Sequence, residues 1–192
     1  MRQIGSAVFV VLLFASLASA QVPGGNVFFG YSYYSEDLSS INQQPDTGGW
    51  GRAKTNGWEA SFEGKVIPFL GFVADFDSHY DSQNLTIVCP AGPSCPTVSA
   101  NITEHNFLFG PRVSFPAGRF RPFVEGLFGG AHMNISEGVG SDYSFATALG
   151  GGLDYKIIKP LAWRFQGDYV QTRLFGATQN NVRLSTGIVF RF

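Results

Sequence analysis

The sequence predicts an all-β protein: an eight-stranded antiparallel up-and-down transmembrane β-barrel, preceded by a cleaved signal peptide. Three observations lead to this prediction. Eight stretches have strand character and are long enough to cross a bilayer. The breaks between them alternate between long and short. The chain also stops on "NVRLSTGIVFRF", a stretch with strand periodicity whose last residue is Phe192.

The first element is an export signal. Arg2 supplies a positive start, residues 4–17 form an apolar run, and Ala18-Ser19-Ala20 matches a small-x-small cleavage site. A transmembrane anchor is the alternative, but the apolar run is short for a bilayer and ends in a cleavage site. We therefore predict a signal peptide over residues 1–20 and one barrel domain over residues 21–192.

The charge of the chain excludes one class of partner. The formal net charge is −1, and removal of residues 1–20, which contain Arg2 and no acid, changes it to −2. Nucleic-acid binding would require clustered Lys and Arg, so no nucleic-acid partner is expected. No other apolar run approaches the ~20 residues of a membrane helix, so the mature chain can enter a membrane only as strands.

Eight strands follow in order, each near or above the ~9 to 11 residues that a tilted strand needs to cross a bilayer. They are predicted at 26–35, 56–66, 69–80, 103–115, 120–133, 143–155, 161–173 and 182–192. The three short turns each contain a proline, at Pro68, Pro116 and Pro160, whereas the other breaks are longer and polar. Long connections at one end and short turns at the other are typical of outer-membrane barrels.

Side chains alternate most clearly in five strands: 56–66, 69–80, 143–155, 161–173 and 182–192. In the first of these, Trp58 and Phe62 share one face while Glu59 and Glu63 share the other. The strand at 120–133 is ambiguous, because either parity leaves apolar residues on both faces. Alternation predicts two faces for each strand but does not say which one points inward.

The distribution of aromatic residues favours an apolar exterior. A soluble barrel such as a lipocalin would show the same period with its apolar face inside. Here, however, the polar row mixes charges with Gly, Ala and Ser, and the aromatics gather near strand ends. The predicted aromatic bands, at the two membrane interfaces, are Phe115, Trp163, Phe190 and Phe192 on the short-turn side and Tyr33, Trp58, Tyr80, Tyr143 and Tyr169 on the other.

The final strand is expected to pair with the first, which leaves no open edge in lipid. Its alternating Ile188, Phe190 and terminal Phe192 resemble the assembly signal of bacterial outer-membrane proteins. The resemblance implies a Gram-negative-type envelope, and the barrel-assembly machinery as a partner during biogenesis.

From about residue 24 to the end, the chain resembles the OmpA-type outer-membrane β-barrel superfamily, particularly its barrel-only members. The resemblance rests on the segments "FGYSYYS", "NGWEAS", "RPFVEGLFGG", "ALGGGLDY", "DYVQTR" and "NNVRLSTGIVFRF". It implies outer-membrane localisation and contact with outer-membrane lipids. The chain departs from OmpA by stopping at the barrel, without the globular domain that binds peptidoglycan.

The polar row predicts a charged lumen. Its members are the acids Glu59, Glu63, Asp75, Asp77, Glu104 and Asp168 and the bases Lys65, Arg112, Arg164, Arg183 and Arg191. Paired carboxylates could serve acid/base catalysis, but the interior of eight strands is just wide enough for its own side chains. We therefore expect mutual neutralisation in a packed core, in preference to an open pore.

No catalytic, cofactor or metal site is expected. A hydrolase needs a nucleophile beside an oriented base, but His79 and Ser78 lie on opposite faces, and no His-x-Ser pair occurs around His105 or His132. The histidines also lack acidic or Cys partners at ligand spacing.

The two cysteines, Cys89 and Cys95, lie close together in one loop of an exported chain, which favours a disulfide between them. The predicted function is a monomeric structural scaffold whose exposed loops recognise or adhere to a surface ligand. The sequence does not identify that ligand. The alternatives are a narrow porin-like channel and, third, a lipid-modifying outer-membrane enzyme.

Overall fold

The computed structural model describes residues 24–37, 52–86, 97–136 and 140–192. The signal peptide predicted at residues 1–20 and the disulfide predicted between Cys89 and Cys95 lie outside these ranges, so both stay predictions. Among the residues described, no helix is long and apolar enough to span a membrane.

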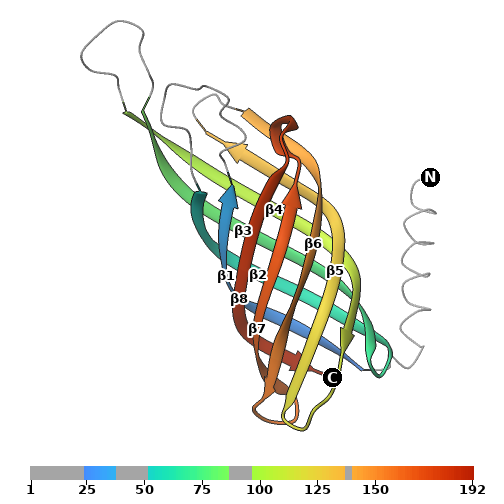
Figure 1. The fold of residues 1–192 in the computed structure, drawn as a ribbon. Helices are drawn as coiled ribbons and strands as arrows, with labels where there is room; N and C mark the ends of the chain where they lie inside the picture. The colour runs from blue at the N-terminus through green and yellow to red at the C-terminus, as the bar shows by residue number, and fades with distance from the viewer. Residues whose placement is uncertain (1–23, 38–51, 87–96, 137–139) are drawn as a thin grey trace, which may run out of the picture.

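Eight antiparallel strands close into one barrel, which confirms the predicted fold class (Figure 1). They are β1 (Gly25–Asp37), β2 (Arg52–Ile67), β3 (Leu70–Thr86), β4 (Thr97–Ser114), β5 (Phe120–Ile135), β6 (Gly140–Lys156), β7 (Leu161–Thr172) and β8 (Gln179–Arg191). Each strand pairs with its neighbour in sequence, and β8 pairs with β1 to complete the ring.

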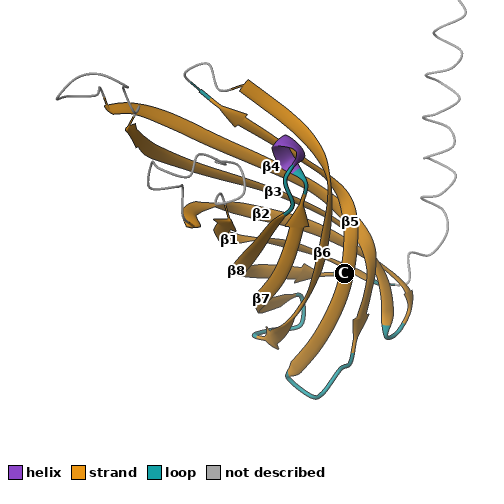
Figure 2. Ribbon diagram, turned by 45° about the horizontal axis from the view of Figure 1, so that its top comes forward, coloured by secondary structure: helices purple, strands orange, loops and turns teal. Residues whose placement is uncertain are grey.

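The closure includes the last residue of the chain. The amide of Gly25 donates to the carbonyl of Phe192 at 3.0 Å, and the amide of Phe192 donates to the carbonyl of Gly25 at 3.1 Å. The turns β2–β3, β4–β5 and β6–β7 lie at this same end of the barrel (Figures 1 and 2). The strand ends that flank residues 38–51 and 87–96 lie at the opposite end, which we call the upper end.

Several strands extend beyond the predicted bounds at the upper end. The ladder between β3 and β4 continues to the Thr86–Thr97 pair, although the prediction ended the third strand at residue 80 and began the fourth at 103. The sequence of these extensions is mostly polar, so hydrophobic alternation gives little signal there. A short 3₁₀ turn, Leu174–Gly176, stands between β7 and β8, where the prediction had only a loop.

The structure assigns the ambiguous faces of β5. Phe123 and Leu127 point inward and are 4% and 3% exposed, whereas Val124 and Phe128 point outward and are 59% and 42% exposed. The sequence was ambiguous because part of the lumen is itself apolar, so both faces of β5 carry apolar residues. Glu125 lies on the inward face and is buried.

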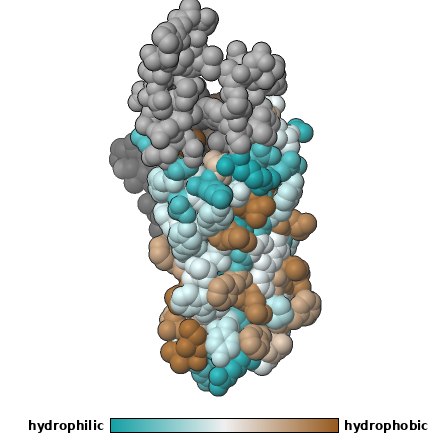
Figure 3. All heavy atoms as spheres, turned by 60° about the vertical axis from the view of Figure 1, so that its left-hand side comes forward, coloured by the Kyte–Doolittle hydropathy of each residue, from teal (hydrophilic) through white to brown (hydrophobic). Residues whose placement is uncertain are grey.

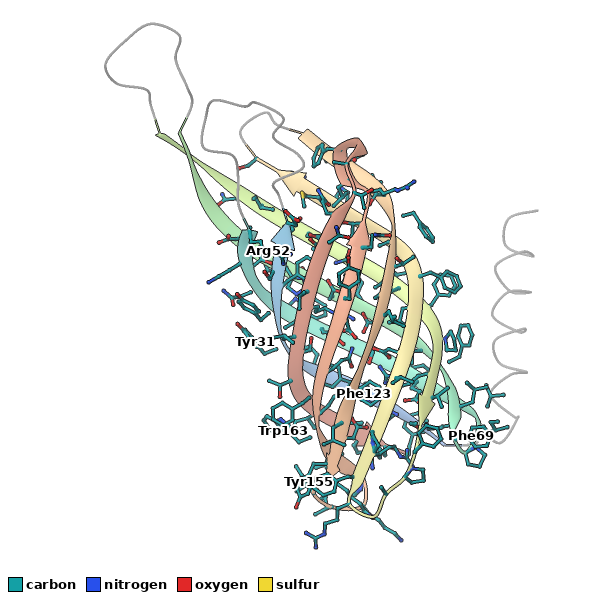
Figure 4. All side chains as sticks on the ribbon, in the orientation of Figure 1. Tyr31, Arg52, Phe69, Phe123, Tyr155 and Trp163 are labelled. Carbon is teal, nitrogen blue, oxygen red and sulfur yellow. The ribbon has the colours of Figure 1, made fainter. Side chains whose placement is uncertain are left out.

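The outer wall is apolar. Phe29, Phe72, Phe107 and Leu149 are more than half exposed, and Figure 3 shows hydrophobic side chains over the body of one face, with hydrophilic ones toward the upper end. Side chains such as Tyr31, Trp163 and Phe69 stand outside the ribbon, while Phe123 lies within it (Figure 4). Such a surface is unfavourable in water and matches the lipid-facing wall of a transmembrane barrel.

Candidate functional site: a packed polar lumen

The centre of the lumen is organised around Arg183, which β8 presents on its inward face. Its guanidinium lies 2.7 Å from Asp75 Oδ1 and 2.8 Å from Asp168 Oδ2, 3.5 Å from Glu59 Oε2, and also bonds Asp77. All five side chains are at most 3% exposed. One cation thus serves four carboxylates supplied by three other strands, β2, β3 and β7.

Two further arginines lie toward the short-turn end. Arg112 donates to Glu125 at 2.6 Å and to Glu63 at 3.3 Å. Arg164 makes a bidentate contact with Asp154, with distances of 2.7 and 3.1 Å. Both guanidinium groups also stack over the ring of Phe123, at 4.4 and 4.7 Å from its centroid. Buried arginines are therefore held both by carboxylates and by an aromatic face.

Neutral amides join these clusters. The side-chain nitrogen of Gln166 lies 3.2 Å from Glu59, 2.9 Å from Glu125 and 2.9 Å from Asp168, so it connects the Arg183 cluster to the Arg112 cluster. Asn26 donates to Glu63 at 2.7 Å. The lumen is a continuous hydrogen-bonded network filled by the protein's own side chains.

The residues of the predicted lumen network lie on the inward face. Nine of the eleven are buried: Glu59, Glu63, Asp75, Asp77, Glu104, Arg112, Arg164, Asp168 and Arg183. Lys65 and Arg191 lie at the short-turn mouth, with side chains 9% and 17% exposed, and they pair with Glu63 and Asp154 respectively. Glu36, Glu125, Asp154 and Gln166 were not predicted as members of this network. Alternation in the sixth strand could have found Asp154, which shares its polar row.

Glycines on β6 make room for this packing. A Cβ at Gly150 would lie 1.8 Å from Asp168 Oδ1, and one at Gly152 would lie 2.7 Å from the ring of Phe123. The lumen side chains of neighbouring strands thus lean over the glycines, and a larger residue at either position would collide with the network.

The upper part of the lumen is closed by a second layer. Asn181 donates to the hydroxyl of Tyr34 at 2.9 Å and to Thr172 at 3.3 Å, and Thr172 donates to Gln179 at 2.7 Å. Leu174, from the 3₁₀ turn, is fully buried against an apolar cluster that includes Tyr34. Polar and apolar contacts together thus pack this part of the lumen.

Under this layer, three residues have the order of a hydrolase triad. His79 Nε2 lies 2.9 Å from Ser32 Oγ, and His79 Nδ1 lies 3.1 Å from Asp77 Oδ1. Ser32 could not be predicted as a neighbour of His79, because the two residues are 47 positions apart and meet only through the register of β1, β2 and β3.

The setting of these residues differs from that of a catalytic site. Ser32, Asp77 and His79 are fully buried, and the ring of Tyr34 stacks on His79 at 4.7 Å. In the described part of the chain, no cluster of His, Cys, Asp or Glu is arranged to hold a metal ion.

Glu36 is fully buried near the upper end of β1, beyond the strand segment that was predicted to cross the bilayer. It lies in β1 above the outward tyrosines, between the polar residues Ser35 and Asp37. Burial raises the pKa of the Glu36 carboxyl well above its ordinary value, and the negative charges of Glu104 and Asp81 raise it further.

Comparisons with known proteins add structural relatives only. No family model matches the sequence, and no curated protein sequence matches it. Among solved structures, neisserial surface protein A aligns with a TM-score of 0.65 and 14% identity, covering 88% of this chain and 97% of that one. Ail, the attachment invasion locus protein of Yersinia pestis, aligns with a TM-score of 0.55 and 15% identity, covering 88% and 98%. At such identities the likeness extends to the fold, and the chain has the fold of the small eight-stranded outer-membrane β-barrels.

Proposed function

We propose that this protein is an outer-membrane scaffold of a Gram-negative-type bacterium and that its upper connections recognise or adhere to a surface ligand. The packed lumen is the observation that carries the proposal. Arg112, Arg164 and Arg183 are packed in the interior with their carboxylate partners among the residues that the structure describes, which favours a scaffold over an open channel. Recognition then falls to the connections, which a rigid barrel holds in place.

Further points of the proposal follow from the same arrangement. The apolar wall supports contact with outer-membrane lipids, and the pairing of Phe192 with Gly25 supports its use as the terminal signal of the barrel-assembly machinery. Closure of every strand edge supports a monomer, because no strand is left to pair with a second copy. Membership of the OmpA-type superfamily is part of the same proposal, since strand number, order and alternation agree with it.

The test of recognition uses display on cells. The protein would be expressed in a bacterial host that lacks adhesins of its own, beside variants in which residues 38–51 or 87–96 are replaced by Gly-Ser segments of equal length. Binding to cultured cells and to purified matrix proteins would be measured, with folding checked by heat-modifiable gel migration. We expect binding by the wild-type protein and its loss in at least one folded variant. Equal binding by all folded forms, or by the empty host, would overturn the proposal.

The channel alternative is tested in planar bilayers. A packed lumen predicts no steady conductance steps from the purified protein. Reproducible steps that change in size when Arg183 is replaced would establish a pore through the lumen and replace the scaffold proposal.

The enzyme alternative has one specific observation in its favour, the Ser32–His79–Asp77 arrangement. An active triad would make Ser32 react with a fluorophosphonate probe, and Ser32→Ala would abolish the labelling. We expect no labelling of the folded barrel, because Ser32 is fully buried.

A further inference from the structure

Two histidine side chains lie on the outer wall formed by β4, β5 and β6 and take no part in the lumen network. His105 on β4 and His132 on β5 are direct partners in the sheet, and their rings are nearly parallel, with centroids 6.4 Å apart. Tyr143, the partner of His132 on β6, stacks on that ring at 4.0 Å. We call these three residues the imidazole ladder.

The ladder is unusual for its position. Both histidines are half-buried and point outward at the level of Tyr80, which meets His105 edge-on at 6.2 Å. Between the two predicted aromatic bands, the outward rows of the described strands contain no other imidazole and no charged side chain. Two adjacent imidazoles on an otherwise apolar wall give this level of the surface a pair of nitrogen donors close to the membrane interface.

Directly below the ladder the wall is hollow. In the next row of the sheet, Gly130 stands between Phe107 on β4 and Phe145 on β6, so two large rings flank a missing side chain. The groove there has a volume of about 460 Å³ and is lined by these residues together with Phe76 and the ladder. A Cβ on Gly130 would meet no atom closer than 3.8 Å, so packing does not require glycine at this position.

We propose that the imidazole ladder and the Gly130 groove bind a phosphate-bearing lipid of the outer leaflet. One acyl chain lies in the groove between Phe107 and Phe145, and the phosphate accepts hydrogen bonds from the imidazoles and the Tyr143 hydroxyl. Lipid chains are as apolar as the groove, so the chain alone gives little selectivity and the headgroup contact decides which lipid stays. The level of the ladder, near the upper band, places the phosphate at the membrane interface.

The electrostatics of this face suit an anion. The outward groups around the two imidazoles are Ser78 and Tyr80 from β3, Thr103 from β4, Asn134 from β5 and Ser141 and Tyr143 from β6, none of which is a carboxylate. His105 Nδ1 is buried without a hydrogen-bond partner in the described part of the chain, which leaves Nε2 as the ring nitrogen available to a ligand. A ring nitrogen that carries a hydrogen can donate it to a phosphate oxygen.

This inference rests on the proposed outer-membrane orientation, but its test is independent of surface recognition. The purified barrel in neutral detergent would be titrated with dipalmitoyl phosphatidic acid or with dipalmitoyl glycerol, which has the same chains and no phosphate. Native mass spectrometry would count the retained lipid molecules. We expect the wild-type protein to retain one phosphatidic acid and to bind the uncharged lipid about tenfold more weakly or less, as loss of a charge-assisted contact predicts.

Three variants locate the site. His105→Phe/His132→Phe keeps the stacked rings and removes the nitrogen donors, and Gly130→Leu fills the groove; each should lower phosphatidic acid affinity about tenfold. Gly126→Leu is the matched control, since Gly126 lies on the same face of β5 and a Cβ there meets no atom within 4 Å. It should bind as the wild type does. If the double variant folds poorly, His132→Phe alone gives the same comparison.

Each other outcome overturns the proposal. Equal retention of the two lipids would mean that the groove binds acyl chains without recognising the phosphate. Unchanged phosphatidic acid affinity in the folded histidine variant would show that the imidazole ladder does not bind the phosphate. An equal loss of affinity in Gly126→Leu would show that the lipid associates with the wall non-specifically. Lipid retention is measured on the isolated barrel, so it does not depend on cell binding. A failure of the cell-binding test would not refute the lipid site, and a failure of the lipid test would not refute surface recognition.

Discussion

Replacing Arg183 with methionine should destabilise the barrel more than any other single neutralisation in the lumen. Methionine keeps much of the side-chain length and removes the positive charge. Four carboxylates then lose a shared partner, and Asp75 and Asp168 lose contacts of 2.7 and 2.8 Å. All four are buried, so water cannot replace the guanidinium without opening the packing.

The magnitude follows from the number of groups left without a partner. Removing one member of a buried ion pair costs about 3–5 kcal/mol, and with four carboxylates affected we expect Arg183→Met near the upper end of that range. Arg164→Met should cost less, about 1–3 kcal/mol. Its carboxylate partner Asp154 keeps a second cation, Arg191, at 3.0 Å. The difference between the two variants is a stricter test than either value alone.

The measurement is urea unfolding of the protein folded into lipid vesicles, followed by tryptophan fluorescence and by gel migration without heating. Asp168→Asn combined with Arg183→Met should recover part of the loss, because it removes one of the uncompensated charges. A cost below about 1 kcal/mol for Arg183→Met, or equal costs for the two arginine variants, would refute a dry, paired lumen and indicate screening by water.

Three further predictions concern the ends of the barrel. Deleting Phe192, or replacing it with Glu, should reduce insertion without altering export, and a normal yield of folded protein in the membrane fraction would contradict the terminal-signal reading. Cys89 and Cys95 should appear as one linked peptide in non-reducing mass spectrometry, with reduction leaving barrel stability unchanged; two free thiols would disprove the bond. Because the folded-state pKa of Glu36 is raised, its protonation stabilises the folded barrel: that contribution is full below the unfolded pKa and is lost as pH rises through the folded value. Glu36→Gln should therefore reduce the decline in unfolding free energy between acidic and neutral pH, and identical pH profiles for the two proteins would rule out the effect.

The number, order and inward faces of most strands were predictable because their causes are local. A two-residue period places Glu59 and Arg183 on faces opposite to Trp58 and Leu184 whatever the rest of the chain does. Prolines in the short breaks mark turns by the same local logic, since proline removes a ladder donor. The polar ends of β3 and β4 and the faces of β5 were not predictable, because the two faces of those segments differ little in polarity.

The sequence by itself thus determined that this chain forms a closed barrel with charges inside and aromatic rings outside. Only the tertiary structure decided which charges meet. Arg183 and Asp75 are separated by 108 residues and face each other across the lumen, so their contact depends on the stagger of all eight strands when the ring closes. The same holds for Ser32 beside His79, and for the groove that Gly130 leaves between Phe107 and Phe145. Alternation specifies the side of the wall on which a residue lies, whereas register specifies its neighbours, and register is a property of the closed sheet.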